Sequence, residues 1–360
     1  MQRIVSVIQE HGFQCLPCHR LNLDAERFSE YRDTEEHHVE QLFERPDPAT
    51  HRVRVPEISS TSPAILRYFL DGSRRTYRVA DIIIGGRYLP LVAAQVGVAV
   101  MERTSGGRAV LPVRKYCQFR NIVAFPDTAN ADDLRSLQDR INRKSPVSFQ
   151  VERYEVKRDH DPIDLAVAKI MRRMQDMEVE AVAMLSQDSR LGNSAMLIVD
   201  GPLRFREMPG RHFDIVQFRN VLGVSNTVQP SQSPERGRRK MDVGLLASSL
   251  EFGDRTPVFK TTDDKRTIGM WYLRLRRPEG RTNALQGVVK IECYAVDWQD
   301  REEGLDGERV SVISGHILRE RNVTPFGADW RWASHLYPIY LAERYIKSSF
   351  MSDECFLALF

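Results

Sequence analysis

The hydrophobic pattern of the chain changes near residue 63 and divides it into two regions. Residues 23–45 place apolar side chains at mostly helical spacing, which predicts an amphipathic helix. Residues 46–63 carry four prolines and little periodicity, which is typical of a connector. We therefore predict an N-terminal helical extension and connector over residues 1–62 and one domain over residues 63–360.

Beyond this point, strand-like apolar runs alternate with helical patterns, which predicts an α/β fold. The first runs are separated by turn-like glycines and suggest a strand meander. The predicted strands cover 65–70, 81–84, 89–101, 195–199, 271–275 and 288–296, and the predicted helices cover 132–142, 163–185 and 330–346. Residues 229–240 and 299–308 lack core character and predict surface loops.

Composition and charge are those of a globular protein with no membrane role. A length of 360 residues with 42% hydrophobic residues is ample for a packed core. A formal net charge of +3 permits a phosphate-binding face without demonstrating one. Five cysteines form no disulfide framework, and no apolar run is typical of a signal peptide or a membrane span. We therefore expect a cytoplasmic protein.

Two aspartates stand directly after apolar runs and directly before glycine, at Asp71 and Asp200. Glycine lets the chain turn sharply, so both carboxylates are expected at strand ends. Two strand ends in one sheet can converge. The sequence therefore predicts that Asp71 and Asp200 lie close together.

A third acid is expected from the helix over residues 163–185, where Glu178 and Glu180 are the candidates. At about 100° per residue, Glu178 falls within the apolar stripe of this helix and Glu180 projects about 160° away from it. A carboxylate on an apolar face is costly unless it is paired or bound to a metal ion. We therefore select Glu178.

Three such acids suit phosphodiester hydrolysis with divalent cations. Two-metal sites activate water and stabilise the attacking and leaving oxygens, and Mg²⁺ or Mn²⁺ prefers the oxygen ligands that these acids supply. Each residue taken alone also fits a purely structural role. Asp-Gly is a common turn, and Glu178 can form a buried ion pair with an arginine.

Several segments together resemble the NurA family of DNA end-processing nucleases, in the family's order and over residues 66–346. These segments are Asp71-Gly-Ser-Arg74, Met171-Arg-Arg-Met-Gln-Asp-Met-Glu178, Leu197-Ile-Val-Asp200-Gly-Pro-Leu203, Val221-Leu-Gly-Val-Ser225, Trp271-Tyr-Leu-Arg-Leu275 with Val289-Lys-Ile-Glu292, and His335-Leu-Tyr-Pro-Ile-Tyr-Leu-Ala-Glu-Arg344. The chain departs from the family pattern at Asn226, where NurA proteins commonly have lysine. Its first sixty residues match no segment of the family.

The resemblance implies an RNase H-like mixed sheet flanked by helices, with additional C-terminal strands and a helix. It also implies Mn²⁺ or Mg²⁺ as cofactor, DNA as substrate, a homodimer, and a HerA-type hexameric ATPase as partner. Carried onto this chain, the metal ligands would be Asp71, Glu178 and Asp200. His335 would complete the catalytic site from the C-terminal helix, with Tyr337 as a further contributor.

Basic residues near these motifs are candidates for DNA binding. Arg74 and Arg75 follow the first Asp-Gly pair, where they are placed to hold phosphates beside a metal. A second basic cluster comprises Arg236, Arg238, Arg239 and Lys240. Ordinary surface charge is the alternative for both groups. A separate Cys15-Leu-Pro-Cys18-His19 segment has haem-attachment or half-zinc spacing, against the default of reduced loop cysteines.

The sequence thus predicts an enzyme, a metal-dependent deoxyribonuclease acting in DNA repair by end resection or in antiviral defence. The chain has no phosphate-binding Gly-x-x-x-x-Gly-Lys-Ser/Thr loop, so movement of DNA would come from the partner ATPase. One alternative is a NurA-like scaffold without catalysis that binds DNA or regulates the ATPase. Another is an RNase H-like enzyme that acts on RNA or on hybrids.

Overall fold

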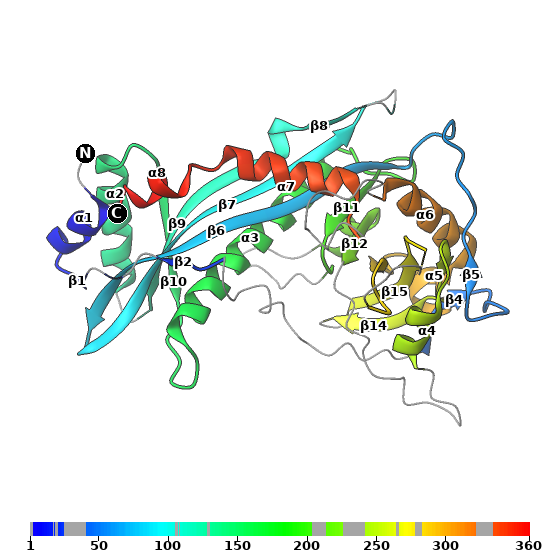
Figure 1. Ribbon diagram of the computed structural model, residues 1–360, viewed down its shortest axis with the longest axis horizontal. Coiled ribbons are helices and arrows are strands. Elements are labelled where there is room, and N and C mark those ends of the chain that lie inside the picture. Colours follow the sequence, from blue (N-terminus) through cyan, green and yellow to red (C-terminus); the bar gives the residue numbers. More distant parts are fainter. Residues whose placement is uncertain are drawn as a thin grey trace.

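One large mixed sheet flanked by helices forms the protein (Figure 1). The computed structural model describes residues 3–16, 18, 21–24, 41–104, 107, 109–127, 130–203, 214–225, 242–263, 266–277, 283–321 and 334–360. Along the main path the strand order is β10-β9-β7-β6-β11-β12-β16-β15-β13-β5. The predicted α/β class is confirmed at this level.

The strands of the main path differ greatly in length. In spatial order they are β10 (Phe149–Tyr154), β9 (Gln118–Pro126), β7 (Arg87–Arg103), β6 (Leu66–Ile84), β11 (Met196–Asp200), β12 (Val221–Ser225), β16 (Val288–Tyr294), β15 (Arg266–Arg274), β13 (Asp254–Arg255) and β5 (Val53–Arg54). Shorter strands join from the side: β1 (Gln14–Leu16) and β2 (Leu21–Asn22) on β6, β8 (Val110–Pro112) on β7, β14 (Phe259–Asp263) on β15, and β3 (Gln41–Leu42) on β14. A separate pair is formed by β4 (Glu44–Arg45) and β17 (Leu305–Asp306).

A long hairpin of β6 and β7 forms the centre of the sheet. β6 runs for 19 residues and continues through Asp71, which opposes Ala99 of β7. The prediction that a strand ends at Asp71 is therefore wrong, and segments 65–70 and 81–84 are two ends of one strand. The backbone groups of the buried strand β7 need hydrogen-bond partners along its whole length, and β6 supplies them only by remaining extended.

The sheet is mixed because β11 runs parallel to both of its neighbours, β6 and β12. β10 is also parallel to β9, whereas β12, β16 and β15 follow one another in antiparallel pairs. The predicted strands 195–199, 271–275 and 288–296 correspond to β11, β15 and β16. The register of the β6–β11 pair determines which residues of the two strands lie opposite each other.

Helices cover both faces of the central strands (Figure 1), with α3 and α7 on opposite sides of the β6–β7 hairpin. The helices are α1 (Ile4–Glu10), α2 (Ala131–Lys144), α3 (Pro162–Gln187), α4 (Val243–Ser249), α5 (Trp298–Glu303), α6 (Gly307–Glu320), α7 (Tyr337–Ser349) and α8 (Asp353–Leu357), with 3₁₀ turns η1 (Arg114–Tyr116) and η2 (Ile215–Phe218). In the part of the chain that is described, no helix has the length and apolar character to cross a membrane.

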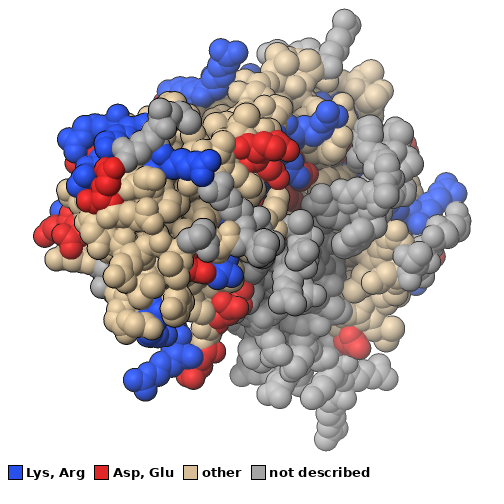
Figure 2. Space-filling view, turned by 60° about the vertical axis from the view of Figure 1, so that its left-hand side comes forward, with Lys and Arg blue, Asp and Glu red and all other residues tan. Residues whose placement is uncertain are grey.

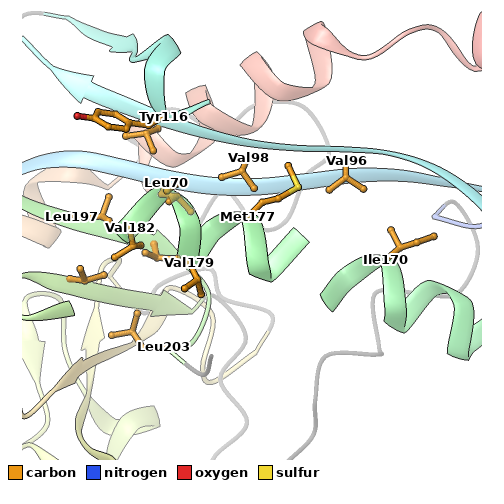
Figure 3. Close-up of a cluster of buried hydrophobic side chains, with 14 of the residues drawn as sticks. Leu70, Val96, Val98, Tyr116, Ile170, Met177, Val179, Val182, Leu197 and Leu203 are labelled. Atoms are coloured by element: carbon orange, nitrogen blue, oxygen red, sulfur yellow. The ribbon is translucent and has the colours of Figure 1, made fainter. Parts of the chain in front are cut away.

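Strand alternation divides the core into two layers. On the α3 side, Leu70 and Leu197 from adjacent strands lie in one buried cluster with Met177 of α3 (Figure 3). On the α7 side, Phe69 belongs to a second cluster with Ile339 of α7. Successive residues of β6 therefore face α3 and α7 in turn, as the pleat of a strand requires.

The two central helical predictions are confirmed. Residues 132–142 lie within α2 and residues 163–185 lie within α3. The side chains of Asn130 and Asp161 cap these helices by accepting hydrogen bonds from backbone N–H groups in the first turn. Pro162 begins α3, where its missing N–H group has no cost.

Two other predictions are wrong. Residues 299–308 form parts of α5 and α6 with β17 between them, because the Asp306 side chain caps α6. Residues 41–45, predicted as the end of a helix, form β3 and β4. The Glu44 carboxylate in this segment is buried and accepts hydrogen bonds from the Arg255 guanidinium at 2.6 and 2.9 Å, a tertiary contact that local periodicity does not reveal.

Parts of three predicted segments lie outside the described residues. These parts are 25–40 of the N-terminal helix, the whole loop 229–240, and 330–333 of the C-terminal helix. The described remainder of the C-terminal helix is α7, which begins at Tyr337.

α7 approaches the sheet closely at Gly97 of β7. A Cβ atom placed on Gly97 would lie 2.6 Å from Cγ2 of Ile346 and 2.9 Å from Cδ1 of Phe119. Ile346 is fully buried on the inner face of α7. The absence of a side chain at position 97 therefore allows α7 to lie against the central hairpin.

We predict that Gly97→Ala lowers the free energy of unfolding by about 1–3 kcal/mol, because the added methyl group overpacks this contact. Gly192→Ala is the matched control, since a Cβ atom there meets nothing within 4 Å. Urea denaturation of the wild type and both variants measures the effect. Equal midpoints for the two variants would contradict the described seating of α7.

Candidate functional site

Asp71 and Asp200 lie side by side near the centre of the sheet. Leu70 of β6 opposes Val199 of the parallel strand β11, so the next residue of each strand stands at the same level. The residues two positions earlier in both strands belong to the α7-side core, so alternation directs the two carboxylates toward that face. The predicted proximity of the two aspartates agrees with this register.

The prediction that a strand ends at Asp200 is confirmed. Asp200 is the last residue of β11, and Gly201 turns the chain with a φ of +108°, a conformation that favours glycine. A Cβ atom on Gly223 of β12 would lie 2.8 Å from the Gly201 carbonyl oxygen, so the turn folds tightly over the neighbouring strand.

Gly72 does not form the turn that the sequence suggested. Its φ is not positive, and a Cβ atom on Gly72 would collide with Oε1 of Glu178. The glycine therefore leaves room on the α3 side of the sheet for the Glu178 carboxylate. Through this gap, Glu178 approaches the strand that carries Asp71.

The choice of Glu178 over Glu180 agrees with the burial of the two side chains. Glu178 is 7% exposed, whereas Glu180 is only partly buried and lies 3.6 Å from the Arg173 guanidinium. Among the described residues, no hydrogen-bond donor or cation contacts the Glu178 carboxylate. The alternative of an arginine partner for Glu178 is therefore not found in this part of the chain.

Burial and mutual repulsion make these acids hard to ionise. Burial first, and then the Asp200 charge, raises the pKa of Glu178 to about 8. Burial also holds the pKa of Asp71 well above its usual range, followed by the charges of Asp200, Glu343 and Glu178. The backbone N–H of Gly72 partly opposes this rise in the Asp71 pKa. The cluster therefore favours either protons or a bound cation.

Glu343 of α7 is an acid near this cluster that the sequence reasoning did not select. Its charge contributes to the raised pKa of Asp71, and its carboxylate lies 2.5 Å from Nζ of Lys347 one helical turn later. The residue stands in the C-terminal segment that resembles NurA, but only the seating of α7 on β6 and β7 reveals its position. Local sequence carried no signal that distinguishes it from a surface acid.

A buried network holds the turn that follows Asp200. The Glu292 carboxylate accepts a hydrogen bond from the Leu203 N–H at 2.9 Å and lies 2.7 Å from Nζ of Lys290. The Tyr294 hydroxyl donates to the Leu203 carbonyl oxygen. All three side chains come from β16 and are almost completely buried. They fix the direction in which the chain leaves β11 and so help to position Asp200.

His335 and Tyr337 lie at the beginning of α7. His335 is 5% exposed, whereas Tyr337 is 44% exposed and its ring stacks on that of Tyr340. In the described part of the chain, no hydrogen bond or ion pair joins either residue to the three acids. Their catalytic roles therefore stay predictions that rest on the family resemblance.

The predicted DNA-binding arginines of β6 have partners within the protein. Arg74 lies 3.4 Å from the Asp24 carboxylate, and Arg75 lies 3.2 Å from the Asp353 carboxylate of α8. Both pairs are partly exposed, so contact with phosphates stays a prediction. The second basic cluster (Arg236, Arg238, Arg239 and Lys240), together with Asn226, lies outside the described residues.

The described cysteines and acids do not form a ready-made metal centre. Among the described residues, no three His, Cys, Asp or Glu side chains lie close enough together to hold a metal ion as they stand. Cys15 is buried in β1, and burial raises its pKa to about 11, which disfavours the thiolate that zinc would need. His19, the last residue of the Cys-x-x-Cys-His segment, lies outside the described part.

Comparison with known proteins does not assign the chain to a family. No family model matches it, and no curated protein matches it either. The resemblance to NurA therefore stays a prediction, carried by the segments that suggested it.

We predict that Glu178→Gln raises the free energy of unfolding of the metal-free protein, relative to the wild type, more at pH 8 than at pH 5. The folded state holds the Glu178 proton more tightly than the unfolded chain, with a pKa of about 8 against 4.5. The stabilisation from this proton is complete below pH 4.5 and is lost as the pH rises toward 8, whereas glutamine has no such loss. One pKa unit corresponds to about 1.4 kcal/mol, so the advantage of the variant should grow by a few kcal/mol.

Urea unfolding at a series of pH values in the presence of a chelator measures this difference. An advantage of Glu178→Gln that is the same at pH 5 and pH 8 would contradict the burial of an unpaired carboxylate at this position.

Proposed function

We propose that the chain is a metal-dependent nuclease that hydrolyses phosphodiester bonds of DNA at Asp71, Glu178 and Asp200. The supporting observation is that Asp71 and Glu178 are buried beside Asp200, and that among the described residues no cation contacts either Asp71 or Glu178. Burying carboxylates without a partner is unfavourable. A divalent cation bound among them would offset that cost.

The donor set suits Mn²⁺ or Mg²⁺, because these ions prefer oxygen ligands and all three side chains are carboxylates. When bound, such an ion supplies activated water and stabilises negative charge on the phosphate. Asp71 and Asp200 would hold it from the α7 face of adjacent strands, and Glu178 would have to reach it from the α3 face, where Gly72 leaves room for its carboxylate. The acids must lose their protons for this, and they must move closer together than they lie in the protein alone.

Residues around the acids would hold them in place and handle protons. The Glu292 network would keep the turn after Asp200 in one conformation. The Asp200 carboxylate would then already be in place before the substrate binds. In the NurA-like arrangement, His335 would contact the scissile phosphate or move a proton, with Tyr337 beside it.

DNA as the substrate, a homodimer and a HerA-type hexameric ATPase as partner complete the proposal, with end resection or antiviral defence as its task. These elements rest on the resemblance to NurA. On the face shown in Figure 2, Lys and Arg side chains are interspersed with Asp and Glu. DNA contacts on that face would therefore be local, made by individual arginines rather than by one broad basic field.

A second candidate function is a scaffold of the same fold that binds DNA or regulates the ATPase without cutting. The spacing of the acids favours this alternative, since no three of them in the described chain lie within reach of one ion. A cleavage assay separates the two candidates.

We predict that the wild type cuts linear or circular DNA with Mn²⁺ and that Asp200→Asn reduces the rate at least about 100-fold. Metal-ion catalysis supplies several kcal/mol, and each 1.4 kcal/mol is about tenfold in rate. Glu180→Gln is the matched control, because it removes an acid of the same helix that is paired with Arg173. The control should cut like the wild type.

The assay is run with and without the partner ATPase, and RNA and hybrid substrates are offered in parallel. Equal cutting by Asp200→Asn and the wild type would reject the site. DNA binding without cutting under any condition would favour the scaffold, and preferential cutting of RNA or hybrids would change the substrate class.

A further inference from the structure

The outer face of α7 carries a stripe of aromatic and basic side chains, here called the α7 ladder. It consists of Tyr337, Tyr340, Arg344 and Lys347. At about 100° per residue, these four positions fall within an arc of about 80° on one side of the helix. The opposite side packs against the sheet through buried apolar residues, including Ile339 and Ile346.

The side chains of the α7 ladder already contact one another in order. The rings of Tyr337 and Tyr340 are stacked with their centroids 6.4 Å apart and an interplanar angle of 28°. The Arg344 guanidinium lies 5.9 Å from the centroid of the Tyr340 ring. Tyr337 is 44% exposed, Arg344 and Lys347 are exposed as well, and Tyr340 is half-buried. The ladder is therefore a preordered row of two tyrosine rings followed by two cations.

The ladder borders the carboxylate cluster. Glu343 lies about 40° from Lys347 on the helical wheel, between the exposed stripe and the buried side of α7. Its carboxylate pairs with Lys347 at 2.5 Å, and α7 itself packs on β6, the strand that carries Asp71, through the buried cluster that contains Phe69 and Ile339. A polymer that lies along the exposed side of α7 would therefore run over the helix that covers the face of the sheet toward which Asp71 and Asp200 point.

We propose that the α7 ladder binds the unpaired bases of single-stranded DNA beside the carboxylates, a proposal that rests on the nuclease function above. Bases of a single strand stack on aromatic side chains regardless of sequence, and Arg and Lys attract the phosphates between them. Bases within a duplex are already stacked on each other and cannot use these rings. The ladder thus favours a single strand or a frayed end over an intact duplex.

Fluorescence anisotropy in a chelating buffer tests this binding without cleavage. The probes are a labelled oligothymidylate and a labelled blunt-ended duplex. Tyr340→Ala should raise the Kd for the oligothymidylate at least about fivefold, because one stacking platform is lost. The Kd for the duplex should not change. Tyr340→Phe should bind like the wild type, since the ring is retained.

Tyr88→Ala is the matched control, because Tyr88 is a tyrosine 66% exposed on β7, outside the ladder. Thermal unfolding confirms that each variant is folded. Unchanged oligothymidylate binding by Tyr340→Ala would overturn the proposal, as would an equal loss for the duplex or an equal loss in Tyr88→Ala.

The Mn²⁺ cleavage assay on the same proteins separates this proposal from the nuclease function. Selective loss of single-strand binding in Tyr340→Ala, with no cleavage by the wild type, would support the ladder and reject the nuclease. Cleavage by the wild type together with unchanged binding by Tyr340→Ala would reject the ladder alone.

Discussion

Burying Asp71 and Glu178 away from any described cation costs free energy that the rest of the fold must offset. Asp71 and Glu178 are both at least nine-tenths buried, and among the described residues neither has a cationic partner. Repulsion between them and Asp200 adds to the cost and raises the pKa of both groups. A fold selected for stability alone would replace such acids with apolar residues. Their presence motivates the proposal that the acids bind a cation.

The architecture brings these acids together from elements far apart in the chain. The β6–β11 register places Asp71 level with Asp200, and Gly72 removes the one side chain that would keep Glu178 of α3 away from the sheet. α7 then covers the other face and brings Glu343 near Asp71. The same helix exposes its aromatic and basic stripe next to the cluster. The helix α7 thus contributes both to the surroundings of the candidate acids, through Glu343, and to the candidate binding surface on its outer side.

Local pattern was enough to predict some of this arrangement. The helical wheel distinguished Glu178 from Glu180, and the Asp-Gly pair at Asp200 correctly predicted a turn, in which Gly201 has a positive φ. The same dipeptide at Asp71 led to a wrong prediction of a strand end. Pairing with β7 keeps β6 extended there, and Gly72 instead leaves room for a side chain of α3. Glu343 was not selected, since its position depends on how α7 lies on the sheet. Long-range pairing and packing determine these features, and hydrophobic periodicity does not encode them.

Direct measurement of Mn²⁺ binding tests the central claim that the buried acids form a cation site. Electron paramagnetic resonance of free Mn²⁺ in a titration compares the wild type with the double variant Asp71→Asn/Glu178→Gln, which removes both charges with little change in shape. We predict saturable Mn²⁺ binding by the wild type and its loss in the double variant, with proton release on binding because burial and mutual repulsion raise the pKa of both acids. Equal binding by the two proteins, or no saturable binding by the wild type, would contradict it.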